Sequence, residues 1–188
     1  IYFGEKDFQQ LKILEDFIKK NHSNCEVIPC KTIRDKNNVA LSSRNFHLNK
    51  LTGGYSWILE SNQVKDSTNY CYGFAFVMLA YAMAFKAGLD EAKEYIEETF
   101  KKMDEYFWEE EFGLYADEIS ADWSTVSKYR GQNANMHSCE ALIAAYEATN
   151  EKKYLDKALI IADNICNRQA EQADGLIWEH YDSDWMID

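Results

Sequence analysis

Apolar residues recur at helical spacing through most of this 188-residue chain. The spacing predicts four long helices, over residues 72–86, 90–107, 134–148 and 153–170. The first is apolar almost all round and is expected to be buried on most sides. Short turns near Gly88 and Asn150 join the helices in pairs. Antiparallel pairs of this kind are typical of a bundle or a toroid of helices.

Polar and apolar positions also predict how two of these helices begin and pack. Asp90 is expected to cap the second helix, because its carboxylate can accept the free N–H groups of the first turn. The fourth helix is expected to direct one set of residues inward, namely Leu155, Ala158, Leu159, Ala162 and Ile165.

The first 48 residues follow a different pattern. An apolar stripe predicts a helix over residues 7–20, and a short strand is expected from Cys25 to Ile28. Helix, strand and loop in this order indicate a piece of an α/β fold. The change of pattern predicts a boundary between His47 and Gly53, which divides the chain into residues 1–49 and 52–188.

Composition narrows the classes of partner. The net charge of −12 disfavours nucleic acid and anionic membranes, because an acidic surface repels phosphate. No apolar run reaches the roughly 18 residues that span a bilayer. Five cysteines without CxxC spacing are expected to be free thiols in a reducing compartment, so we expect a soluble cytoplasmic protein without a zinc site.

Candidate phosphate-binding residues lie near the N-terminus. Lys6 and Asp7 open the predicted helix, and Ser42, Ser43 and Arg44 add hydroxyls and a guanidinium that suit phosphate oxygens. From the residues alone, an ordinary helix cap and a polar loop are the simpler alternatives. Three motifs carry a resemblance to a known family, namely FGEKDFQQL from Phe3, the I-P-x-x-T-x-R run over 28–34, and ALSSRN over 40–45.

These motifs resemble pantothenate synthetase, the pantoate–β-alanine ligase. The resemblance implies a Rossmann-like nucleotidyl transferase that uses ATP and Mg²⁺. It places Lys6 and Asp7 at the nucleotide, Gln10 at pantoate, and the phosphates at Ser42, Ser43 and Arg44. The upstream half of that family, with its His-containing phosphate motif, has no counterpart in the chain. We therefore expect an α/β fragment without ligase activity.

A second set of candidates lies in the helical region. Asn133, His137 and Glu140 share one helix face, where an imidazole beside amide and carboxylate groups can act as acid or base. His180 follows Glu179, and aromatic residues are scattered nearby, as is typical of sugar pockets. A core histidine and core aromatics are the alternatives, and no third ligand favours a metal.

The segments GGYSWILESNQVKDSTNYCYGFAFVMLAYAMA, ADWSTVSKYRGQNANMHSCEALIAAYEAT and GLIWEHYDSDW resemble the N-acylglucosamine 2-epimerase family, in its mannose and sulfoquinovose isomerase branch. The resemblance implies a mainly α fold, a partial (α/α)6 barrel (a helix toroid), over residues 52–188. It implies cofactor-free and metal-free proton transfer between C1 and C2 of a mannose-type sugar through a cis-enediol.

Carried over by motif, the resemblance makes His137 and His180 the catalytic candidates. It gives substrate-binding roles to Tyr72, Arg130, Asn133 and Trp185. The family's early arginine has no counterpart, and its downstream GHxxEW helix lies beyond Asp188. We therefore expect weak or absent activity, with a ligase fragment and a non-catalytic fused remnant as alternatives, and homo-oligomers through exposed helix faces.

Overall fold

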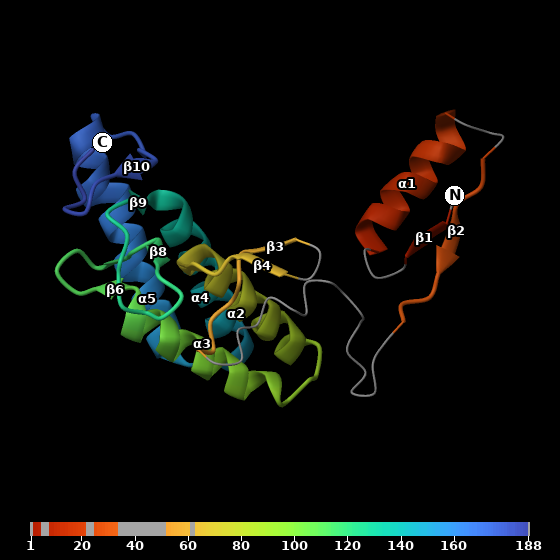
Figure 1. The fold of residues 1–188 in the computed structure, drawn as a ribbon, viewed down its shortest axis with the longest axis horizontal. Helices are drawn as coiled ribbons and strands as arrows, with labels where there is room; N and C mark the ends of the chain where they lie inside the picture. The colour runs from red at the N-terminus through yellow and green to blue at the C-terminus, as the bar shows by residue number, and fades with distance from the viewer. Residues whose placement is uncertain (1, 5–7, 22–24, 34–51, 61–62, 188) are drawn as a thin grey trace. The chain divides into compact units, whose positions relative to one another are not determined.

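The computed structural model describes residues 2–4, 8–21, 25–33, 52–60 and 63–187. The chain divides into two compact units, residues 1–45 and 46–188 (Figure 1). None of the helices in the described part combines the length and hydrophobicity that a membrane span requires.

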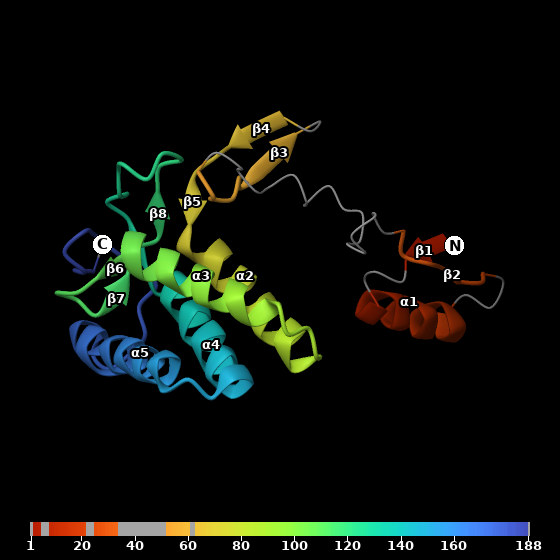
Figure 2. The same cartoon turned by 90° about the horizontal axis from the view of Figure 1, so that it is seen from below.

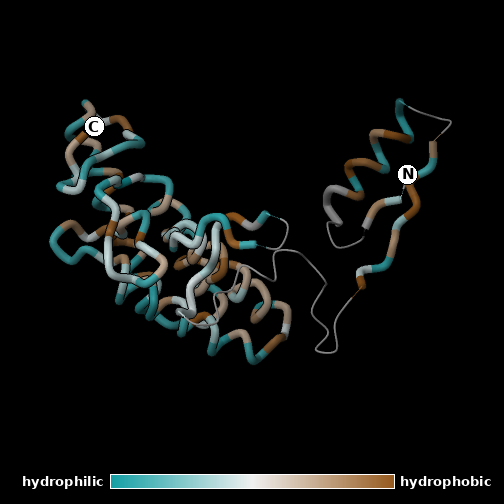
Figure 3. Tube along the Cα trace, in the orientation of Figure 1, coloured by the Kyte–Doolittle hydropathy of each residue, from teal (hydrophilic) through white to brown (hydrophobic). Residues whose placement is uncertain are grey.

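The smaller unit is a β–α–β segment. It consists of β1 (Tyr2–Gly4), α1 (Phe8–Asn21) and β2 (Ile28–Cys30), and the two strands pair in parallel. Hydrophilic and hydrophobic positions alternate along α1 (Figure 3), and Leu11 and Ile18 are buried. The predicted helix is confirmed, but the strand begins at Ile28 rather than ending there. Pro29 fits within it because a strand of a two-stranded sheet has a free edge that needs no N–H donor.

Four long helices build the larger unit, as the sequence predicts, and Figure 2 shows how they are arranged. They are α2 (Cys71–Lys86), α3 (Ala92–Tyr106), α4 (Gln132–Thr149) and α5 (Lys152–Asp163). After α5 the helix continues as a π-helical turn and then a 3-10 turn, over Asn164–Gln169 and Ala170–Ala173. Helices α2 and α3 pack together, as do α4 and α5, and α2 also packs against α4.

Helices α2 and α4 run parallel to each other. Cys71 at the start of α2 lies beside Ser138 in α4, with 3.5 Å between sulfur and hydroxyl. At the other end, Lys86 Nζ binds Glu147 Oε2 at 3.0 Å. The first turns of both helices therefore lie at the same end of the unit.

Short antiparallel strand pairs gather at that end. Strand β5 (Asn69–Tyr70) pairs with β8 (Glu118–Ile119) directly before α2, and β9 (Arg130–Gly131) pairs with β10 (His180–Tyr181) directly before α4. In this unit, β3 (Ile58–Glu60) also pairs with β4 (Gln63–Asp66), and β6 (Trp108–Glu109) pairs with β7 (Leu114–Tyr115). These connections place several chain segments around the two helix starts.

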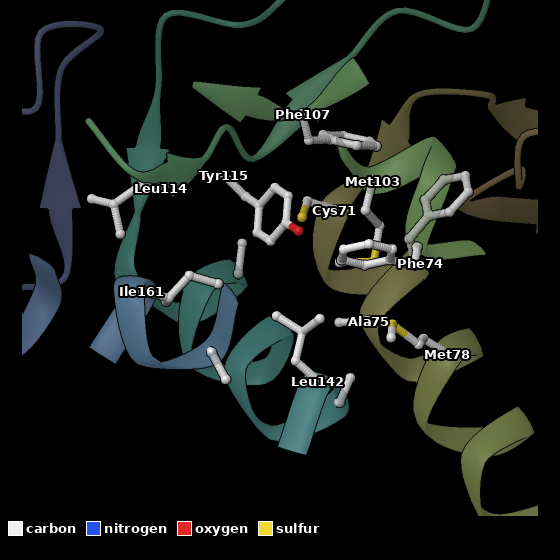
Figure 4. Packing of buried hydrophobic residues seen from close by; sticks show 14 of the residues in the cluster. Cys71, Phe74, Ala75, Met78, Met103, Phe107, Leu114, Tyr115, Leu142 and Ile161 are labelled. Carbon is white, nitrogen blue, oxygen red and sulfur yellow. The ribbon is translucent and has the colours of Figure 1, made fainter. Parts of the chain in front are cut away.

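One hydrophobic core joins all four helices (Figure 4). Its largest members include Phe74, Met78, Ile96, Met103, Phe107, Leu114, Tyr115 and Tyr154. Full burial of side chains of this size contributes about 1.5–3 kcal/mol each. The core therefore accounts for the close packing of α2, α3, α4 and α5.

The predictions about helix faces hold in part. Helix α2 is exposed along one stripe, which includes Phe76 and Met83, and it is buried or half-buried on its other sides, as expected. In α5, Leu159 is 59% exposed, and Tyr154 and Ile161 are buried instead. Positions 154, 158, 161 and 165 form one stripe at helical spacing that faces the core, so the prediction is confirmed for Ala158 and Ile165 and wrong for Leu159.

The predicted cap of α3 is also wrong. Glu91 precedes the helix, and its side chain makes no capping hydrogen bond. Asp90 accepts the N–H of Lys93 through its backbone carbonyl at 3.2 Å, and Leu89 accepts that of Ala92 at 3.0 Å. Backbone acceptors in the turn thus replace the carboxylate that the sequence suggested.

Asn150 ends α4 in the left-handed conformation, with φ of 59° and ψ of 21°, and its N–H donates to Tyr146 O. Asn150→Ala should lower the free energy of unfolding by about 1 kcal/mol, because a Cβ-bearing residue without a polar side chain disfavours this conformation. Asn150→Gly should be neutral or slightly stabilising. Urea unfolding followed by circular dichroism tests both, and equal midpoints for the two variants would contradict the explanation.

Candidate functional site

Tyr72 and His137 meet where α2 and α4 begin. Tyr72 is the second residue of α2, and His137 lies in the second turn of α4. Their ring centroids are 5.0 Å apart with the planes at 84°, an edge-to-face contact. Phe76 lies one turn after Tyr72, with its ring centroid 4.9 Å from that of His137. The parallel packing of the two helices thus unites two residues that are 65 positions apart.

A carboxylate orients the imidazole. His137 Nδ1 lies 3.0 Å from Glu140 Oε2, one turn further along α4, as their spacing predicts. When Nδ1 carries the proton it donates to Glu140, and Nε2 keeps a lone pair for a ligand. The His137 side chain is 22% exposed, so a solute can reach the ring.

Aromatic rings extend this surface. Trp57 lies 5.9 Å from Tyr72 and 4.6 Å from Tyr70, between ring centroids. Trp57 and Phe76 are each about two-fifths exposed. Asn133 is exposed one turn before His137 on the same face of α4. Exposed rings beside an amide and an imidazole offer stacking surface and hydrogen-bonding groups together, a combination that suits a sugar.

His180 has a different set of partners. It lies on β10 opposite Gly131, and its Nδ1 is 2.9 Å from the hydroxyl of Tyr129. Within the described residues, the ring contacts of His180 are with Tyr129, whereas those of His137 are with α2. A shared catalytic role for the two histidines stays a prediction.

Arg130 and Trp185 are buried around one carboxylate. Arg130 donates from Nε and Nη2 to the two oxygens of Glu109 at 2.7 and 2.6 Å. Trp185 donates its indole N–H to Glu109 Oε2 at 2.9 Å and is 1% exposed. Both side chains therefore hold β6, β9 and the C-terminal segment together. The predicted contact of Arg130 and Trp185 with a sugar stays a prediction.

Asp117 is a residue that the sequence reading missed. It lies between β7 and β8 with 9% exposure, and its Oδ2 accepts the N–H of Gly131 at 2.5 Å. Burial raises its pKa to about 7, although the Gly131 N–H and the Arg130 guanidinium act in the opposite direction. No local pattern marks an aspartate in a short loop as buried, so only tertiary structure identifies it.

The ligase-like candidates lie largely outside the described residues. This holds for Lys6, Asp7, Ser42, Ser43 and Arg44. Gln10 belongs to α1, but its side chain is also outside the description. The predicted use of ATP and Mg²⁺ therefore stays a prediction. Across the described ranges, no group of three or more His, Cys, Asp or Glu side chains is placed to hold a metal ion.

Relatives of known name match both parts of the sequence. The D-mannose isomerase of Marinomonas mediterranea is 54% identical over 138 residues, which are 73% of this chain and 35% of that protein. Pantothenate synthetase of Azobacteroides pseudotrichonymphae is 53% identical over 47 residues, 25% of this chain and 17% of that enzyme. The chain spans about a third of the length of the mannose isomerases that it matches.

Solved structures agree with the helical part of this result. A crystal structure of a D-mannose isomerase matches with a TM-score of 0.73 and 53% identity, over 76% of this chain and 36% of that one. Cellobiose 2-epimerase from Spirochaeta thermophila matches with a TM-score of 0.68 at 19% identity, over 77% and 39% of the two chains, and shows the fold alone. These neighbours confirm a mainly helical unit of the (α/α)6-barrel type, whereas the Rossmann-like assignment of the N-terminal segment stays a prediction.

A family model covers most of the sequence. Residues 36–188 match the model described as N-acylglucosamine 2-epimerase (GlcNAc 2-epimerase). The match includes both helices of the Tyr72–His137 contact and the strands around them. The chain therefore belongs to the N-acylglucosamine 2-epimerase family.

Proposed function

We propose that the chain is part of a carbohydrate isomerase or epimerase of the D-mannose isomerase type, acting on a mannose-type sugar. The observation that carries this proposal is the placement of His137, bound to Glu140, against Tyr72 at the helix starts of a family member. The high identity to a D-mannose isomerase supports the choice of sugar class.

The proposed chemistry needs only acids and bases. Converting an aldose to a ketose moves one hydrogen from C2 to C1 and one from O2 to O1, so no oxidant or reductant is consumed. Abstraction of the C2 proton gives a cis-enediol, and protonation at C1 gives the ketose, whereas return of the proton to C2 on the other face gives the epimer. A positioned imidazole can carry such a proton near neutral pH.

The side chains around His137 each have a role in this proposal. As a neutral ring His137 accepts a sugar hydroxyl at Nε2, and as an imidazolium it protonates the O1 region, while Glu140 fixes the ring through Nδ1 in both forms. Tyr72 and Trp57 offer faces or edges to the C–H groups of the sugar, and the Asn133 amide binds a hydroxyl. We propose that the chain by itself binds sugar and turns it over weakly or not at all, because the described face supplies one histidine for a two-step proton transfer.

Two NMR measurements on the 188-residue chain test this proposal. Saturation-transfer NMR should detect D-mannose, and His137→Gln should weaken binding by about tenfold through loss of a hydrogen bond to the sugar. Glu140→Gln should weaken it less. Glu147→Gln is the matched control on the same helix, because its partner is Lys86 on the surface. Deuterium incorporation at C2 in D₂O measures turnover directly. Mannose binding that is equal in His137→Gln and the unsubstituted chain would contradict the site.

A further inference from the structure

Asp117 contacts the starts of both helices that form the site. Its backbone carbonyl accepts the N–H of Cys71, the first residue of α2, at 2.8 Å. Its carboxylate accepts the N–H of Gly131, the residue immediately before α4, at 2.5 Å. Tyr72 follows Cys71 directly, and His137 lies six residues after Gly131. One residue therefore links the two chain segments that carry the contacting rings.

The loop around Asp117 has a second tie to α4. The side chain of Asn135 accepts the N–H of Tyr115 at 2.8 Å and donates to its carbonyl at 2.8 Å. Asn135 is fully buried, and its amide also donates to Gly131 O at 3.3 Å. Residues 115–117 thus bind the first turn of α4 at two points, Tyr115 at Asn135 and the Asp117 carboxyl at Gly131, directly before the helix.

Gly131 shows that this close approach is a requirement of the packing. Its φ of −139° and ψ of 142° are extended values that any residue adopts. A Cβ at this position would lie 2.8 Å from the hydroxyl of Tyr129 and 2.9 Å from Asp117 Oδ1. The absent side chain, not backbone freedom, is what allows the Asp117 carboxyl to reach the N–H of Gly131.

We propose that Asp117 is a positioning residue of the sugar site: by joining the start of α2 to the start of α4, it holds Tyr72 edge-on against His137. Asp117 has no contact with substrate in this scheme and acts through the two helices. The importance of this geometry for sugar binding rests on the proposed function, but the geometry itself is testable without sugar.

The test uses NMR of the full chain with labelled histidine. The resonances of the His137 ring protons are assigned through His137→Gln. Their chemical shifts should be displaced from the usual histidine values by the neighbouring rings of Tyr72 and Phe76. Asp117→Ala frees the Gly131 N–H and should remove most of this displacement. Asp117→Asn keeps an oxygen acceptor of the same shape and should restore it. A folded Asp117→Ala variant with unchanged His137 resonances would overturn the proposal.

Two further variants complete the design. Gly131→Ala serves if Asp117→Ala does not fold. The added Cβ pushes the Asp117 carboxyl away from the N–H of residue 131, so it should also move the His137 resonances towards the values of a histidine without neighbouring rings. Tyr154→Phe is the control, because it removes a buried hydroxyl that binds Glu97 at 2.9 Å between α5 and α3. Equal shifts in Tyr154→Phe would indicate general loosening and overturn the specific role of Asp117.

A mannose titration of the same samples separates the two proposals. If the unsubstituted chain does not bind mannose but Asp117→Ala still changes the His137 resonances, the positioning role stands and the proposed function fails. If mannose binds and Asp117→Ala weakens it together with the ring contact, while Asp117→Asn does neither, both are supported. Unchanged resonances and unchanged binding in Asp117→Ala overturn the positioning role alone.

Discussion

Replacing Glu109 by alanine is expected to lower the free energy of unfolding by about 3–5 kcal/mol, the usual cost of leaving one partner of a buried ion pair alone. Both Glu109 oxygens bind Arg130, whose side chain is only 5% exposed. The same carboxylate accepts the indole N–H of Trp185. Its removal leaves a buried guanidinium and a buried donor without their acceptor, although Arg130 keeps Nη1 bonds to the carbonyls of Ser127 and Tyr129.

Urea unfolding followed by circular dichroism measures this loss. Glu109→Gln keeps one acceptor and the side-chain shape, so it should lie between the alanine variant and the unsubstituted chain. Adding Arg130→Met to Glu109→Ala should recover part of the stability by removing the unpaired charge. Glu147→Ala breaks an exposed pair and should change stability by about 1 kcal/mol or less. If Glu109→Ala loses as little stability as Glu147→Ala, the stabilising role of the Glu109 contacts with Arg130 and Trp185 is contradicted.

The four helices were predictable because their apolar spacing is local. The inward face of α5 was harder to predict, since this helix has more apolar residues than the core covers. Leu159 and Ile161 are equally apolar in α5, yet only Ile161 is buried. The choice between them depends on where neighbouring helices lie, which spacing within one helix does not encode.

The same limit applies to the site. The pairing of His137 with Glu140 was predictable, because residues three apart in a helix are neighbours. Contact with Tyr72 follows only from the parallel packing of two helices. The burial of Trp185 and Arg130 was not predictable from their motifs, because both bind Glu109, which lies 76 residues before Trp185. A partner so distant in sequence leaves no local pattern.

Substituting Asp117 by asparagine should remove a pH dependence of stability that amounts to about 2–4 kcal/mol. Burial raises the pKa of Asp117 from the ordinary value of 3.8 to about 7. Glu118 and Glu109 raise it further, whereas Arg130 and the Gly131 N–H oppose the shift. Between pH 4 and 7 the unfolded chain therefore releases a proton that the folded protein keeps. Stability falls as the pH rises through this window and levels off above pH 7.

The measurement is the free energy of unfolding of the unsubstituted chain and of Asp117→Asn, from pH 4.5 to 8. Asp66, Glu97 and Glu151 have lowered pKa values and give the opposite slope, but they are common to both proteins and cancel in the difference. The advantage of Asp117→Asn should therefore grow up to about pH 7 and then stay constant, because neither state binds a proton at position 117 above that pH. Asp156→Asn, at an exposed carboxylate paired with Lys152, is the control and should give a nearly flat difference. A flat difference for Asp117→Asn would mean that Asp117 ionises as readily in the fold as in water, and that its contact with Gly131 compensates fully for burial.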